Sequence, residues 1–410
     1  MRNSPKPDVR SLFKRAFAHA PPKVIRVPAT LELLGGYTES QRGVICATTV
    51  DRYLEIAVAP RNDGRLDLVR ENDSQRAEMW VRECVPGMTP GWAAPVAAIV
   101  RHLREKRVNV RGFNAAIVNH IPEGIGLGED AALCLATMLA VRELFPFSIR
   151  ETGFAVDPVR GKESGLSAVS REQAHRIADA CGNATKGRVD GEEGFRKITA
   201  LRNGAFELTQ ADSLNWTSTN HALGGEFGLL LFDAGVRDPK RGLHRSDLEL
   251  CMSNAAERLS VGSLRVLDRV LLGARQHRLS ERGKGVCEFA IGECRRAMAI
   301  GEILGTGDIA QVGRFLSESH DEARKFAGIT APELDALVDL GRSHSACFGA
   351  RFTGNATDGG VLFLVDRIGL DEFQDSIWIE YRRMTGLTPS VDLLKPVAGL
   401  TGRSHPRNCS

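Results

Sequence analysis

Long apolar runs, aromatic residues and net charge are all scarce in this sequence of 410 residues. Phe, Trp and Tyr together make up 6% of the chain, and the formal net charge is only +3. No segment approaches the roughly 18 apolar residues that a membrane-spanning helix needs. A basic surface with interleaved aromatics, which is typical of nucleic-acid binding, is also missing. We therefore expect neither a membrane nor a nucleic acid as a partner.

Close cysteine pairs are missing as well. The nine cysteines are dispersed, and none forms a Cys-x-x-Cys pair. The start Met1-Arg2-Asn3-Ser4 does not resemble a secretory leader, so we expect reduced thiols and a cytoplasmic location. The chain is otherwise 42% hydrophobic and 26% charged, as globular proteins are. Because 410 residues exceed the usual size of one hydrophobic core, two domains are expected.

The hydrophobic pattern indicates an α+β architecture. Alternating or short continuous apolar runs predict strands at 23–26, 52–59, 112–121, 227–232 and 361–365. Apolar residues spaced by three or four predict helices at 131–144, 245–258, 264–275 and 285–304. The segment 148–170 combines glycines, a proline and mixed charge, and it predicts an exposed loop.

The most informative motif is a glycine-rich turn at 122–132, Pro-Glu-Gly-Ile-Gly-Leu-Gly-Glu-Asp-Ala-Ala. It joins a predicted strand to a predicted helix. Glycines at this spacing permit positive φ and bring several backbone N–H groups to one point, where the helix adds its positive end. Such a turn suits a phosphate. The candidate nucleotide-binding residues are therefore Gly124, Gly126, Leu127, Gly128, Glu129 and Asp130.

Two of these residues, Glu129 and Asp130, are acids where phosphates would lie. Three explanations stay open: the turn holds a metal ion, with Glu129 as the candidate ligand; its own side chains fill it; or it no longer binds nucleotide. Acidic residues in the first turn of a helix also stabilise that helix by about 0.3–1 kcal/mol without any ligand. We favour this capping role over metal binding.

Three segments, in this order, resemble the galactokinase branch of the superfamily (GHMP) that also contains homoserine, mevalonate and phosphomevalonate kinases. Segment 27–39, Val-Pro-Ala-Thr-Leu-Glu-Leu-Leu-Gly-Gly-Tyr-Thr-Glu, is similar to Ala-Pro-Gly-Arg-Val-Asn-Leu-Ile-Gly-Glu-His-Thr-Asp. The glycine-rich turn is similar to Pro-x-Gly-x-Gly-Leu-Ser-Ser-Ser-Ala. Segment 349–360, Gly-Ala-Arg-Phe-Thr-Gly-Asn-Ala-Thr-Asp-Gly-Gly, is similar to Gly-Ala-Arg-Met-Thr-Gly-Ala-Gly-Phe-Gly-Gly-Cys. The resemblance covers nearly the whole chain.

This resemblance implies a two-domain α+β fold. The N-terminal domain, 1–215, would be of the ribosomal-protein S5 domain 2 type, and the C-terminal domain, 216–410, would be ferredoxin-like. ATP, Mg²⁺ and a sugar would lie in the cleft between them. Phosphoryl transfer there needs cations on the phosphates, a metal ion and usually a group that orients or deprotonates the attacking hydroxyl.

The position of the family's catalytic arginine is occupied by Thr30. A hydroxyl cannot neutralise developing phosphate charge, and losing one such donor typically costs on the order of 10²- to 10³-fold in rate. Arg26 lies four residues earlier on the same face of the predicted strand and is one substitute. A surface role for Arg26 is the simpler account.

The family's catalytic aspartate aligns with Lys186 when the alignment carries no gap. A lysine ammonium accepts no proton at neutral pH unless strongly desolvated, and losing a general base typically costs on the order of 10²- to 10⁴-fold. An alignment with inserted residues brings Asp190, Glu192 or Glu193 to this position instead. Thr30, Lys186 and Asp190 are therefore the predicted catalytic positions, at which the family's residue types have changed or cannot be aligned with certainty.

The sugar-binding positions have changed too. The family's Glu, His and Asp correspond to Gly36, Tyr37 and Glu39, and only Glu39 keeps the chemical type. A Gly-Gly pair at this point also occurs in arabinose-kinase-like relatives, so Gly36 alone is compatible with a changed sugar. The family tyrosine near the sugar aligns with His244. In the third segment, 355–358 replace most of the small residues that let it approach the phosphate loop.

The leading hypothesis is a pseudokinase that keeps the cleft and binds a sugar-like small molecule or a protein partner, with no cofactor. The alternative is an active kinase for a sugar that needs ATP and Mg²⁺, with Lys186 or Arg26 on the phosphates and Asp190 or Glu129 in acid roles. A third hypothesis, a structural subunit, rests on helices such as 285–304, which could pair with a second copy.

Overall fold

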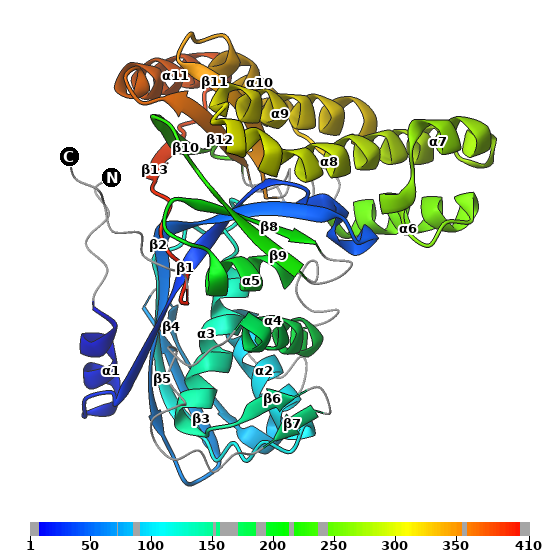
Figure 1. Ribbon diagram of the computed structural model, residues 1–410. Coiled ribbons are helices and arrows are strands. Elements are labelled where there is room, and N and C mark those ends of the chain that lie inside the picture. Colours follow the sequence, from blue (N-terminus) through cyan, green and yellow to red (C-terminus); the bar gives the residue numbers. More distant parts are fainter. Residues whose placement is uncertain are drawn as a thin grey trace.

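The structure is a computed structural model that describes residues 8–71, 73–84, 91–150, 153–155, 171–185, 194–212, 217–236, 245–354 and 359–401. These residues form a seven-stranded sheet, a four-stranded sheet and a two-stranded hairpin, with helices packed on the sheets (Figure 1). The predicted α+β class is confirmed. No helix in these ranges is both long enough and apolar enough to span a bilayer.

The larger sheet has the strand order β4-β3-β5-β2-β8-β9, and β1 pairs with β2. Strand β2 holds it together, because β2 pairs with β1 along most of its length, with β8 near its start and with β5 near its end. The strands are β1 (Lys23–Leu34), β2 (Val44–Pro60), β3 (Arg65–Arg70), β4 (Asp73–Trp80), β5 (Phe113–Asn119), β8 (Glu207–Asp212) and β9 (Thr217–Ala222).

The predicted strands at 23–26 and 52–59 are parts of the longer strands β1 and β2. Residues 27–34 of β1 are buried on both faces, so they show no alternation from which a strand could be predicted. The predicted exposed loop at 148–170 is wrong where it can be checked. Residues in it form β6 (Ser148–Arg150) and β7 (Gly153–Ala155), an antiparallel hairpin. The remainder of that prediction lies outside the described residues.

Both faces of the larger sheet are covered by helices. Alternate residues of β2 and β5 face opposite sides: Ile56 and Ile117 join the main core, whereas Ala57 and Ala116 pack under α1. Figure 1 shows α1 across the sheet from the other helices of this region. These helices are α1 (Val9–Phe17), α2 (Ala94–Glu105), α3 (Glu129–Leu144), α4 (Arg171–Thr185) and α5 (Gly194–Arg202).

The smaller sheet is antiparallel, with the order β11-β12-β10-β13. Its strands are β10 (Phe227–Asp233), β11 (Cys347–Thr353), β12 (Gly360–Asp366) and β13 (Ser390–Leu394). The helices of this part of the chain are α6 (Arg245–Leu259), α7 (Arg269–Arg275), α8 (Glu281–Thr306), α9 (Ile309–Glu322), α10 (Pro332–Arg342) and α11 (Leu370–Thr385). Helices α9, α10 and α11 pack against strands of the smaller sheet, whereas α6 and α7 pack against α8. The predicted helix 264–275 begins only at Arg269, because the Asp268 carboxylate caps it by accepting from Leu271 N at 2.7 Å.

The chain crosses from the larger to the smaller sheet between β9 and β10. We propose that the domain division lies at this crossing, a few residues after the predicted 215/216, because β9 (Thr217–Ala222) still pairs with β8 in the larger sheet. One face of the smaller sheet, with Leu229 and Leu362, joins the core of the larger sheet, while the other face, with Phe232 and Phe363, forms a separate core. The two sheets therefore share a continuous apolar contact.

A fully buried carboxylate, Glu293 of α8, lies where the two parts of the molecule meet. It accepts hydrogen bonds from Gly35 N at 2.8 Å and Ser319 Oγ at 2.6 Å, and it pairs with Arg351 Nη1 at 3.2 Å and Arg296 Nη2 at 3.3 Å. Burial alone raises the pKa of Glu293, but the two arginines and the two hydrogen bonds outweigh burial and lower it. The charge therefore connects the end of β1 with α8, α9 and β11.

We expect Glu293→Gln to lower the free energy of unfolding by about 3–5 kcal/mol, because it removes a fully buried carboxylate that pairs with two buried guanidinium groups. The folded pKa of Glu293 is lowered, so its contribution is present above the unfolded pKa and is lost as pH falls through the folded pKa. The variant should therefore differ most from the wild type near neutral pH. Urea unfolding at neutral and acidic pH measures both effects.

Glu288→Gln is the matched control, because Glu288 lies on the same helix, is partly exposed and meets Arg269 only at 3.7 Å. We expect it to change the free energy of unfolding by about 0.5 kcal/mol or less. Equal effects of the two substitutions would contradict the role assigned to Glu293.

Candidate functional site

The glycine-rich turn lies between β5 and α3, as the sequence predicts. Gly124, Gly126 and Gly128 adopt positive φ values of 77°, 84° and 70°. Residues other than glycine rarely adopt such values. The turn is attached to β1, because Thr30 N donates to Leu127 O at 3.1 Å. The sequence-predicted loop therefore exists with the backbone shape that was inferred for it.

The third segment of the sequence contacts this loop directly. A Cβ atom added at Gly126 would overlap Gly354 N and Thr353 Oγ1, and a Cβ added at Gly354 would lie 2.9 Å from Gly126 N. The close approach between the two loops is thus kept by Thr353 and Gly354 at the end of β11. Residues 355–358, whose composition departs from the family pattern, lie outside the described residues.

The side chain of Glu129 folds back onto the loop. Its Oε1 accepts a hydrogen bond from Gly124 N at 2.9 Å, five residues earlier in the chain. Gly128, the N-cap residue of α3, has no side chain with which to cap the helix. The carboxylate of Glu129 therefore occupies a donor that an anionic ligand of the loop would use.

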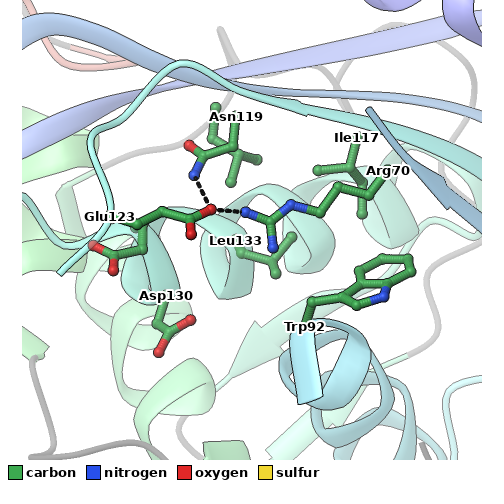
Figure 2. A pocket seen from close by; sticks show the side chains of 9 residues that line it. Arg70, Trp92, Ile117, Asn119, Glu123, Asp130 and Leu133 are labelled. Carbon is green, nitrogen blue, oxygen red and sulfur yellow. Dashed lines mark hydrogen bonds and ion pairs between the residues drawn. The ribbon is translucent and has the colours of Figure 1, made fainter. Parts of the chain in front are cut away.

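A cavity of about 130 Å³ opens beside the loop (Figure 2). Its apolar lining consists of Leu54, Ile117, Leu133 and Trp92. Its polar lining consists of Arg70, Asn119, Glu123, Glu129 and Asp130. The cavity thus combines an apolar wall with a rim in which carboxylates outnumber cations three to one.

Arg70, the one cation that the described residues contribute to this rim, is already paired. Arg70 forms an ion pair with Glu123, and Asn119 Nδ2 donates to Glu123 Oε1 at 3.4 Å. Figure 2 shows both side chains converging on Glu123, with Asp130 projecting from the start of α3. Within the described parts of the chain, no group of three or more His, Cys, Asp or Glu side chains is arranged to hold a metal ion.

Thr30 is buried in β1 beside an arginine that the sequence did not single out, Arg196 of α5. Arg196 Nη1 donates to Thr30 O at 2.8 Å and to Thr30 Oγ1 at 3.4 Å, and Nη2 lies 3.9 Å from Glu32 Oε2. The stem of Arg196 lies on Gly128, where an added Cβ would be 2.7 Å from Arg196 Cδ. A guanidinium therefore reaches position 30 from another element.

Arg26, the substitute considered from the sequence, lies elsewhere. Its guanidinium is exposed, pairs with Glu55 at 3.2 Å and lies 3.6 Å from the ring centroid of Tyr53. The structure therefore agrees with the surface role favoured for Arg26.

Tyr37, a sequence-predicted sugar-binding residue, packs in the separate core on one face of the smaller sheet. Its ring stacks on Phe352 with centroids 5.5 Å apart, and its hydroxyl donates to Gly354 O. Burial, followed by the charge of Glu32, raises the pKa of Tyr37, so the phenol stays protonated. The Tyr37 side chain thus joins the end of β1 to the third segment.

Gly36 and Glu39 are also engaged by protein groups. Gly36 O accepts from Arg245, whose Nη2 lies 3.9 Å from Glu39 Oε2. Gly36 N donates to Glu32 Oε1 at 3.0 Å, and a Cβ added at Gly36 would overlap the Glu32 carboxylate. Glu32 therefore brings a carboxylate to the position where the family's glutamate side chain would begin.

Three predicted site residues, Lys186, Asp190 and His244, lie outside the described residues and stay predictions, as do the alternatives Glu192 and Glu193. Helix α4 ends at Thr185 and α5 begins at Gly194.

Comparisons with known proteins add independent evidence. Residues 94–189 match the family described as GHMP kinases N terminal domain. The galactokinase of Roseiflexus sp. is 24% identical over 400 residues, covering 96% of each chain. The structure of Lactococcus lactis galactokinase complexed with galactose matches with a TM-score of 0.83 at 17% identity, covering 95% of this chain and 97% of that chain.

The chain is galactokinase-like over nearly its whole length, and residues 94–189 match the N-terminal domain of GHMP kinases. Human galactokinase is 24% identical over 368 residues, covering 88% of each chain. The Methanococcus jannaschii mevalonate kinase structure matches with a TM-score of 0.56 at 15% identity, covering 92% of this chain and 98% of that chain. These structural matches confirm the predicted two-domain GHMP fold.

We expect Gly126→Ala to lower the free energy of unfolding by about 2 kcal/mol or more, because a side chain at this positive φ is strained and would overlap the third segment. Gly305→Ala, inside α8 where an added Cβ meets open space, should instead stabilise by about 0.5–1 kcal/mol. Urea unfolding compares the two. A tolerated alanine at 126 would mean that the loops do not pack as described.

Proposed function

We propose that this protein is a catalytically impaired galactokinase-family pseudokinase that acts by binding a sugar-like small molecule or a protein partner in its cleft. The observation that carries this proposal is the hydrogen bond from Gly124 N to Glu129 Oε1 at 2.9 Å. In a phosphate loop this N–H is offered to an anionic ligand. Here the chain supplies the anion itself.

The charge of the adjacent cavity supports the same proposal. Glu123, Glu129 and Asp130 line it, and its guanidinium, Arg70, is ion-paired with Glu123. A nucleoside triphosphate carries several negative charges, and like charges at short range repel unless a cation lies between them. The rim therefore opposes a triphosphate more strongly than it opposes an uncharged molecule of similar size.

The predicted catalytic positions point in the same direction. Thr30 supplies a hydroxyl where developing charge on a transferred phosphoryl group needs a cation. Lys186, if it occupies the place of the family aspartate, supplies no base. Both departures weaken phosphoryl transfer while leaving the cleft between the domains in place.

One observation favours the alternative, an active sugar kinase that uses ATP and Mg²⁺. The Arg196 guanidinium lies at Thr30, so a cation is present near the place where a transferred phosphate would pass. In that case Glu129 would leave Gly124 and serve as a metal ligand, since hard divalent cations prefer carboxylate oxygens.

Calorimetry of the purified protein with MgATP, alone and with a panel of monosaccharides, separates the two functions. We expect no heat of binding at millimolar MgATP and no transfer of phosphate to any sugar. A thermal-shift assay with the same sugars then reports ligands of the cleft. Phosphorylation of a sugar would reject the pseudokinase proposal.

We expect Glu129→Ser to strengthen MgATP binding by about tenfold or more, which corresponds to about 1.4 kcal/mol, because the substitution vacates the Gly124 N–H and removes a charge. Asp130→Ser is the matched control, since it removes an equal charge from the same rim and leaves the bond between Glu129 and Gly124. Equal gains would show that rim charge alone matters. No gain from Glu129→Ser would argue against a filled loop.

A further inference from the structure

Arg196 occupies space that two small residues leave between the glycine-rich loop and β1. The resembling kinases carry arginine at the position of Thr30 and serine at the position of Gly128. In this chain both positions have lost side-chain volume, and the side chain of Arg196 lies between them with 3% of its surface exposed. Its stem packs on Gly128 and its guanidinium on Thr30.

Arg196 packs too closely on Gly128 and Thr30 for serine at position 128 or arginine at position 30 to be accommodated alone. A Cβ atom at Gly128 would lie 2.7 Å from Arg196 Cδ, a separation that real Cβ atoms essentially never show. An arginine at position 30 would place a second guanidinium stem where Arg196 Nη1 already lies 3.4 Å from Thr30 Oγ1. Like charges in a buried site repel strongly.

Arg196 is also fixed from several sides. Thr30 O accepts from Nη1 at 2.8 Å, and the Glu32 carboxylate lies 3.9 Å from Nη2. Glu32 is fixed in turn by Gly36 N at 3.0 Å and lies 3.6 Å from Arg351 Nη2. An arginine that recognises a phosphate presents its fork of donors to the ligand, whereas Nη1 of this guanidinium donates to the backbone and side chain of Thr30 in β1.

We infer that Arg196 is a specificity-determining residue that fills the phosphate-transfer centre and restricts the cleft to ligands without a phosphate group, such as a free sugar or polyol. The inference rests on the proposed function and names the class of ligand that the cleft accepts. It also explains why Thr30 and Gly128 occur together: each leaves room for one part of the same arginine.

The test uses MgATP as the probe in the Glu129→Ser background, where the loop donor is vacant. We expect Glu129→Ser/Arg196→Ala to bind MgATP at least tenfold more tightly than Glu129→Ser, because the centre is opened. Glu129→Ser/Arg196→Met keeps a long stem without the charge and should bind as weakly as Glu129→Ser. Arg202→Ala in the same background removes an arginine of the same helix that bonds to Ser218 and His175, and it should have no effect.

Unchanged or weaker binding by the Arg196→Ala variant would overturn the inference, since Arg196 would then be neutral or a phosphate ligand. An equal gain from Arg196→Met would also overturn it, because volume would not be the cause. A different result would contradict the proposed function: the wild-type protein would itself bind MgATP and phosphorylate a sugar.

A second measurement does not depend on nucleotide. Gly128→Ser should lower the melting temperature of the wild-type protein by more than it lowers that of Arg196→Ala, because the clash with Arg196 Cδ is absent in the second background. The strain of a serine at positive φ is common to both backgrounds and cancels in the comparison. Equal shifts in the two backgrounds would show that Arg196 does not fill this space.

Discussion

The buried charge of Glu293 links the end of β1 to α8, α9 and β11. Its carboxylate fixes Gly35 N, and with it the point where β1 ends, and it holds Arg351 at 3.2 Å. Arg351 in turn faces Glu32 at 3.6 Å, and Glu32 faces Arg196 at 3.9 Å. Charges of alternating sign thus run from α8 to α5. Because a buried charge is costly without its partner, each member constrains the next.

The same row includes two positions at which this sequence departs from the kinase motif that it resembles. Position 30 lacks an arginine, yet the guanidinium of Arg196 lies there. Position 36 lacks a glutamate, yet the carboxylate of Glu32 lies there. In the kinases that this chain resembles, such groups are offered to ligands. Here Arg196 and Glu32 lie 3.9 Å from one another, and each also bonds to the backbone of segment 27–39.

What could be predicted from the sequence is what depends on neighbours in the chain. The glycine-rich loop between β5 and α3 was predictable because φ at Gly124 and the start of a helix are local properties. The extent of β1 was not, because residues buried on both faces lose their alternation. Nor could Arg196 be assigned to Thr30, since 166 residues separate them and only the packing of α5 on β1 brings them together.

The position of Tyr37 in a hydrophobic core limits which residues can replace it. Its ring stacks on Phe352 and its hydroxyl is bonded to Gly354, so a position that serves sugar in the resembling kinases belongs here to a hydrophobic core. A return to histidine would disturb that core before any contact with a sugar was regained. The residue at position 37 is therefore constrained by folding, through its stacking on Phe352 and its hydrogen bond to Gly354 O.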